Sequence, residues 1–437
     1  MVKWLRRLVT PTRRWLRVDP RQILVLQRLT LTALLVSLLV YLLKLGHVLE
    51  GFETRWLDVM AYVDRPTLKQ PVTVVGISDA DYYDPALFAG SSPLDPDALS
   101  RILDRIGEHR PRAVVVDVQL HPAPFEPVNR IQGRMRLYRS LRRLAEDQHI
   151  PVVIVRVPES EGDPHAVPDS LGAAWRALSS CPNLAWADPI LWSHDGVVRS
   201  VSRWIESESG THDYPSVLGA IIRALDLQSH HEPTWFLEEE HPHEPWSIRF
   251  TGRFLEDTTA VSPIRVNAGV LLETPLRPGQ RALLTDRIVL LGGLYGEGRD
   301  THLTPVGEMA GVFIWAEAIA SWMRRDSLRE PPEWITLVLE CLVGVLTGLL
   351  LLRFGPGFGL LWSLFAILPL SILFSLFTFG DRVLFVNFLP SFIGVYIHYQ
   401  VELHLIIREL RHHLRERTGQ LHLLQNRLEQ LEVERDG

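Results

Sequence analysis

The placement of long apolar segments constrains this chain more than any other feature. One apolar span lies near the start, and three more lie close together near the end; the four cover about 23–45, 335–352, 360–379 and 383–401. Segments of this length can cross a bilayer, because roughly 20 apolar residues cover its hydrocarbon core. An even number of crossings places both ends of the chain on one side and the long insert on the other. The near absence of charge in the last three spans disfavours the alternative of core helices in a large soluble protein.

Basic residues indicate which side is which. Lys and Arg are frequent before the first span, and four more follow the last span, at Arg408, Arg411, Arg415 and Arg417. Positive charge close to a span stays in the cytoplasm, so both termini are predicted to be cytoplasmic. Arginines just before the second span oppose this weakly, but long translocated domains often override such charges. No small-residue cleavage site follows the first span, so it is not a cleavable signal peptide.

Composition excludes several classes of protein. The formal net charge of −6 gives no sign of nucleic-acid binding, and the basic start is better explained by topology and by contact with anionic lipid. Of the two cysteines, Cys181 lies in the insert and Cys341 in the second span, so no disulfide is possible within the insert. No cofactor-binding pattern is present.

The insert alternates between two kinds of pattern. Short β-branched runs alternate with segments of helical spacing, which predicts an α/β domain with a mixed, largely parallel sheet covered by helices on both faces. The predicted strands are 71–79, 112–120, 151–157, 184–187, 197–204 and 287–292, and the predicted helices are 95–107, 134–147, 173–178, 216–225 and 311–324. Residues 227–262 are predicted to be a polar excursion and 296–304 a loop.

The tail carries an apolar heptad seam. From Leu403 the apolar positions step by four and three, interrupted by Arg417, and charged residues flank them. This pattern predicts a coiled coil, most simply a parallel homodimer that continues out of the last span. The alternative is a single amphipathic helix on the membrane surface. The predicted dimerisation residues are Leu403, Ile407, Leu410, Leu414, Leu421, Leu424, Leu428 and Leu431.

Motifs in the insert resemble those of a known family. They are Glu53–Asp58 after the first span, Val74–Asp79, Arg112–Gln119, the strand Asp286–Gly293 with the loop Asp300–Pro305, and Met309–Val312 with the helix that follows. Together they resemble the second type of CHASE domain, an extracytoplasmic sensor of bacterial adenylate cyclases, histidine kinases and diguanylate cyclases. The resemblance covers about 50–330.

The spans, their flanking charges and the heptad seam predict a domain organisation that matches that of the family. The predicted parts are a cytoplasmic basic start (1–22), one transmembrane helix (23–49), the sensor domain (50–330), three transmembrane helices (331–401) and a cytoplasmic coiled-coil tail (402–437). The expected location is the bacterial inner membrane. In the family such a coil leads into a cyclase or kinase domain. Because this sequence ends at Gly437, we expect an effector that is a partner protein or was removed.

Acidic residues at strand ends are the candidate ligand site. Asp79, Asp117 and Asp300, with Thr304, end or follow buried strands, and open α/β sheets bind ligands at the carboxyl ends of their strands. They are candidates for binding a polar ligand or a cation. The other reading is that they cap neighbouring helices and loop amides. Gly292–Gly298 could cradle a phosphate, although a tight turn after a strand is the simpler interpretation.

The histidines His230, His231, His241 and His243 are weak metal candidates. They cluster with several glutamates, and imidazole and carboxylate groups suit Zn²⁺, but the segment is otherwise typical of a solvated loop. No catalytic signature is present, so no enzymatic activity is expected. The sequence therefore predicts a transmembrane sensor that passes an unknown outer stimulus to a cytoplasmic cyclase or kinase effector. The alternatives are a non-switching membrane scaffold for partner proteins and a metal-dependent extracytoplasmic enzyme.

Overall fold

The structure is a computed structural model of the whole chain. It describes residues 31–63, 71–120, 128–155, 169–206, 213–229, 245–252, 264–296, 300–326, 332–382 and 389–436, apart from positions 33, 37, 44, 45, 47, 179, 192, 194, 273 and 274. The chain divides into two compact units. One is Asp58–Arg329, and the other joins Met1–Leu57 to Glu330–Gly437. Each unit is described by itself.

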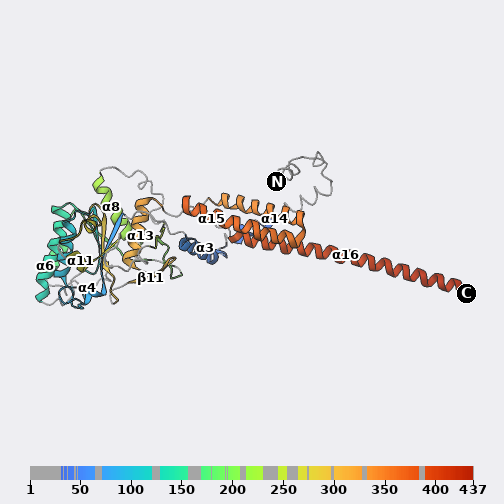
Figure 1. Cartoon of the computed structure of the whole chain (residues 1–437), viewed down its shortest axis with the longest axis horizontal. Helices are drawn as coiled ribbons and strands as arrows, with labels where there is room; N and C mark the ends of the chain where they lie inside the picture. The colour runs from blue at the N-terminus through green and yellow to red at the C-terminus, as the bar shows by residue number, and fades with distance from the viewer. Residues whose placement is uncertain are drawn as a thin grey trace. The chain divides into compact units, whose positions relative to one another are not determined.

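A parallel sheet forms the centre of the Asp58–Arg329 unit (Figure 1). Its strand order is β4-β3-β2-β10-β1-β9, and every neighbouring pair is parallel. The strands are β1 (Val72–Ile77), β2 (Ala113–Asp117), β3 (Val152–Val155), β4 (Leu184–Ala187), β9 (Arg265–Asn267) and β10 (Ile288–Gly293). The predicted mixed α/β domain with a largely parallel sheet is confirmed.

Helices cover both faces of this sheet because its strands are apolar on both sides. In β10, Val289 and Leu291 join one buried cluster, while Ile288 and Leu290 join the other, since successive strand side chains point to opposite faces. The first face packs against α5 (Pro96–Gly107), α6 (Val128–Arg142) with its π-helical extension η2 (Arg143–Asp147), α7 (Asp169–Leu178) and α11 (Ala268–Leu272). The second packs against α8 (Val217–Ser229) and α13 (Gly311–Arg324).

The polar excursion predicted for 227–262 is wrong over its described part. Residues 245–252 run through the core, where Ile248 and Phe250 are buried in the cluster that includes α13. The apolar residues alternate here with polar ones, which is a strand-like pattern inside a polar stretch. Two short antiparallel pairs accompany this segment, formed by β5 (Ser200–Val201) with β8 (Trp246–Ser247) and by β6 (Trp204–Glu206) with β7 (Asp213–Pro215).

The loop predicted for 296–304 is also partly wrong. Its second half is the strand β11 (Thr301–Thr304), which pairs antiparallel with β12 (Gly307–Ala310). Gly307 has φ 129°, a backbone conformation that favours glycine and lets the hairpin turn. The sequence reading also missed the edge strand β9 and the short helices α4 (Asp79–Tyr83) and α12 (Pro278–Ala282). These elements are too short for a periodic pattern to show them.

The second unit is helical. Its long elements are α14 (Glu333–Trp362), the π-helical turn η4 (Ser363–Ile367), α15 (Leu368–Arg382) and α16 (Leu389–Asp436); α3 (Glu50–Val63) begins in this unit. Two helices in the described part are long and apolar enough to cross a membrane, Trp334–Leu351 with mean hydropathy 2.2 and Phe358–Phe379 with 2.3. Gly355, at φ 78° and ψ 170°, breaks α14 between them.

The first predicted span is described only in part. Leu34–Leu43 is a shorter apolar helix, and Val36 and Val40 pack against Ile393 and Ile397 of α16. Gly394 lies beside this contact, and a Cβ there would meet Val40 at 3.6 Å, an ordinary van der Waals distance. The start of that span and residues 383–388 of the last one lie outside the described residues. The predicted heptad tail continues α16 without a break.

Candidate sensory site at the carboxyl edge of the sheet

Three neighbouring strands end together at one edge of the sheet. In the register, Gly76 of β1 lies beside Gly292 of β10, and Gly292 lies beside Asp117 of β2. Gly292 lets α13 start against this edge, because a Cβ there would come within 2.6 Å of the Val312 side chain. The edge therefore gathers the ends of β1, β10 and β2.

Asp79 performs a structural task at this edge. It is the first residue of α4, and its carboxylate accepts a hydrogen bond from the backbone N–H of Gly296 at 2.8 Å. This contact fixes the turn that follows β10, and Gly292 and Gly293 are themselves part of that strand. The glycine segment thus has the geometry of a tight turn up to Gly296; residues 297–298 lie outside the described residues.

Asp81 is a second structural acid that the sequence reading did not identify. It forms a capping box with Ser78, the N-cap of α4, and its other carboxylate oxygen accepts the N–H of Gly269 at 2.9 Å. A Cβ at Gly269 would lie 2.4 Å from that oxygen, so a larger residue there would displace the carboxylate. Asp81 therefore fixes α4 against the start of α11, in the way that carboxylates cap helix ends.

Asp117 differs from both of these acids. It ends β2 and is partly buried, and its carboxylate has no hydrogen-bond partner among the described residues. Burial, and secondly the negative charge of Asp300, raise the pKa of Asp117 to about 7. Both effects disfavour the charged form of a carboxyl group. At neutral pH this side chain is thus close to its titration midpoint and has unused hydrogen-bonding capacity.

Asp300 lies where the β11–β12 hairpin joins α13. Its backbone carbonyl accepts the N–H of Gly311, the first residue of α13, at 2.7 Å. Its side chain is 73% exposed, and its carboxylate lies 2.8 Å from Nε2 of His302. Because the backbone of Asp300 is hydrogen-bonded to the first residue of α13, a shift of the Asp300 side chain can move the start of that helix. In sequence, α13 leads to α14, the helix that contains the second predicted span.

Thr304 serves its own hairpin. Its hydroxyl donates to the carbonyl of Gly307 at 2.6 Å, and the residue is buried. Asp117 ends β2, whereas Asp79 begins α4 just after β1, and β10 lies between those two strands. The structure thus brings Asp117 and Asp300 together, adds His302, which the sequence reading missed, and gives structural contacts to Asp79 and Thr304.

The four metal candidates His230, His231, His241 and His243 lie outside the described residues. Nothing in the structure bears on that prediction.

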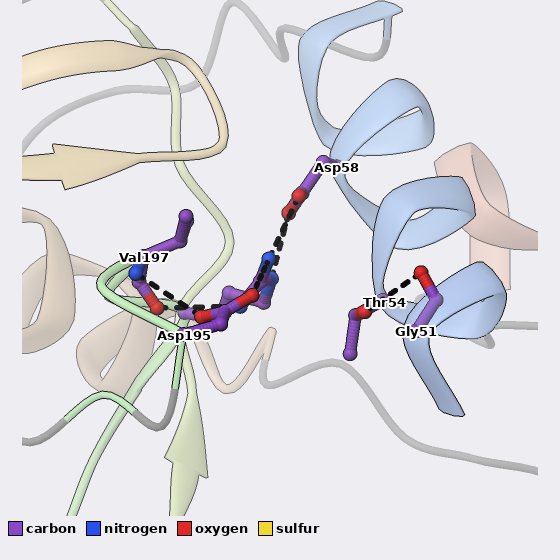
Figure 2. Close-up of polar contacts among 6 residues, drawn as sticks. Gly51, Thr54, Asp58, Asp195 and Val197 are labelled. Atoms are coloured by element: carbon purple, nitrogen blue, oxygen red, sulfur yellow. Dashed lines mark hydrogen bonds and ion pairs between the residues drawn. The ribbon is translucent and has the colours of Figure 1, made fainter. Parts of the chain in front are cut away.

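A second cluster of charged side chains, centred on Arg199, was not predicted from the sequence. Arg199 donates two hydrogen bonds to the carboxylate of Asp58, at 2.7 and 2.8 Å, and two to Asp195, both at 2.9 Å (Figure 2). Only 16% of the Arg199 side chain and 26% of the Asp58 side chain are exposed. The paired arginine lowers the pKa of Asp195. Because Asp58 lies on α3, the guanidinium anchors that helix to the loop before β5.

Comparison with known families gives one match. The sequence model of the CHASE2 domain matches residues 31–352, which includes the α/β domain and the apolar segments that flank it. No curated protein and no solved structure matches the chain. This domain is an extracytoplasmic sensory module of membrane-bound signalling proteins, as the motifs of the insert indicate.

Proposed function

Because this chain belongs to the CHASE2 domain family, we propose that it is a transmembrane sensor that relays an extracytoplasmic stimulus to a cytoplasmic effector. The observation that carries the proposal is the extent of the family match, which joins a sensory domain to apolar segments on both sides. The chain itself performs no reaction in this proposal. A cyclase or kinase acts as its effector, as the family resemblance implies.

The stimulus acts at the carboxyl edge of the sheet. Asp117 supports this, since its carboxylate has no described partner while Asp79 and Asp81 accept backbone N–H groups. The nearby carboxylate of Asp300 makes the edge suitable for a cation or for a ligand that donates hydrogen bonds. A bound ligand shifts the equilibrium between two positions of α13 by the difference between its affinities for them.

Four membrane crossings carry the signal inward. The two apolar helices within α14 and α15 support two of them, and the unbroken α16 supports a last span that continues into the tail. Both termini are cytoplasmic, and the tail pairs with that of a second copy. In the single chain the seam is exposed, as expected of a surface that packs against a partner: Ile407 is 39% exposed, Leu410 57%, Leu414 61%, Leu421 63% and Leu424 59%. The side chains of Leu428 and Leu431 are outside the described residues.

Labelling of single cysteines in intact cells tests this topology. We expect a membrane-impermeant maleimide to label Gly279→Cys, on an exposed helix of the α/β domain, once the outer envelope is opened. It should label Gln420→Cys in the tail only after the inner membrane is permeabilised. Native Cys181 should stay unlabelled, because burial, and then Glu146, raise the pKa of its thiol to about 11, which leaves little reactive thiolate.

Cys341 lies in α14 and is replaced by alanine in both variants. Labelling of Gln420→Cys from outside, or protection of Gly279→Cys there, would contradict the proposed orientation.

A further inference from the structure

Three exposed side chains of α16 lie next to one another on the helix surface. His412 and His413 lie four and three residues before Glu416, so all three meet across one helical turn. Nδ1 of His412 is 3.5 Å from one oxygen of Glu416, and Nδ1 of His413 is 3.4 Å from the other. All three side chains are at least half exposed. This cluster differs from the four histidines that the sequence singled out.

The spacing of these atoms is close to that of a metal site. One ligand atom from each side chain lies within 4.8 Å of the other two. Four ligands bound at about 2.0–2.1 Å in a tetrahedron are about 3.3 Å from one another. Each imidazole nitrogen already lies at about this separation from one oxygen of Glu416, although from a different oxygen in each case. Small rotations of these exposed side chains would bring both nitrogens and one shared oxygen to this spacing. Water can occupy the remaining position.

An ion pair alone explains the arrangement less well. An imidazole forms an ion pair with Glu416 only when it is protonated, and one exposed carboxylate gains little from two such partners. A metal ion uses both imidazoles in their neutral form together with the charged carboxylate. Two nitrogen ligands and one oxygen ligand suit Zn²⁺, Ni²⁺ or Cu²⁺ better than Mg²⁺ or Ca²⁺, which prefer oxygen ligands.

We propose that His412, His413 and Glu416 form a binding site for a divalent transition-metal ion on the tail helix. None of the three is a residue of the apolar seam, so the ion binds without displacing it. The site lies directly before Arg417 and Gly419, which interrupt the seam and weaken the helix. An ion that joins two successive turns there stabilises the helical form, because it binds that form and not the unfolded one. The metal thereby stiffens the segment through which the proposed signal passes.

Quenching of a nearby fluorophore by Ni²⁺ tests the site in the full-length protein in detergent micelles. A dye on Gln420→Cys, with Cys341 replaced by alanine, lies about one helical turn from Glu416 and is quenched only by an ion bound close to it. We expect saturable quenching by Ni²⁺ that weakens at acidic pH, because ligating imidazoles must be neutral. His412→Ala and Glu416→Gln should each raise the Ni²⁺ concentration at half-quenching roughly tenfold or more.

His422→Ala is the matched control. His422 is equally exposed on the same helix, but Thr418 and Asn426 stand one turn before and after it in place of a carboxylate. This variant should keep the wild-type midpoint. An unchanged midpoint in a His412→Ala/His413→Ala double variant, or an equal loss in His422→Ala, would overturn the proposal. Circular dichroism should show the helix intact, since alanine is a strong helix former.

Discussion

Replacing Asp117 with asparagine should stabilise the protein at about pH 8 by on the order of 3 kcal/mol. Burial first, and Asp300 second, raise the pKa of Asp117 in the folded domain to about 7, whereas an aspartate in an unfolded chain titrates near ~3.9. Between these values the folded state holds a proton that the unfolded state has lost. Stability from this group is therefore complete below about pH 4 and is lost as the pH rises through about 7.

Unfolding of the full-length protein in detergent, followed from about pH 4 to about pH 8, measures this effect. The difference between wild type and Asp117→Asn should grow with pH over that window and then level off. Asp300→Asn is the informative second variant. It removes only the smaller cause of the shift, so part of the pH dependence should remain. Parallel curves for wild type and Asp117→Asn would show that the carboxylate of Asp117 already has a partner in the fold.

Replacing Arg199 with methionine should destabilise the α/β domain by about 2 kcal/mol. The guanidinium makes four hydrogen bonds to two carboxylates, and its removal leaves the largely buried Asp58 without this partner. Arg199→Lys should recover only part of the loss, because an ammonium group cannot form two forked contacts at once. Unfolding by denaturant of the full-length protein measures both variants.

Arg136 provides a control with the same chemistry on the surface. It forms a two-pronged pair with Asp97, with both partners well exposed. Solvent weakens such a pair, so Arg136→Met should cause no measurable loss of stability. If Arg199→Met were as harmless as Arg136→Met, the Asp58 contact would not anchor α3.

Five of the six strands of the sheet, all but the edge strand β9, could be predicted from the sequence because each is a short apolar run with its own boundaries. The run of valines at Ala113–Asp117 and the RIVLLG segment of β10 are buried on both faces, and such strands are continuously apolar. The prediction for 245–252 was wrong for the opposite reason. Its alternating pattern is short and lies within a polar stretch. The polar composition of the surrounding residues therefore led to the prediction of a loop.

The roles of the strand-end acids could not be separated from sequence. Asp79 and Asp117 both follow buried β-branched runs, and only the fold shows that the amide of Gly296 reaches one of them while Asp300 lies near the other. The pairing of Arg199 with Asp58 joins residues 141 positions apart, and no local pattern encodes such a contact. The opening motif Glu53–Asp58 pointed to Asp58, but not to its partner.

The proposed mechanism requires that a change at the outer site alters the packing of the inner coil. Crosslinking of single cysteines along α16, in native membranes, tests this most directly. Cysteines at Ile407, Leu410 and Leu414 should crosslink between two copies, whereas one at the outward-facing Arg415 should not. Asp117→Asn, which removes the charge at the outer site, should change the relative yields along the seam. No crosslinking at the seam, or an identical profile in wild type and a folded, inserted Asp117→Asn, would contradict the mechanism.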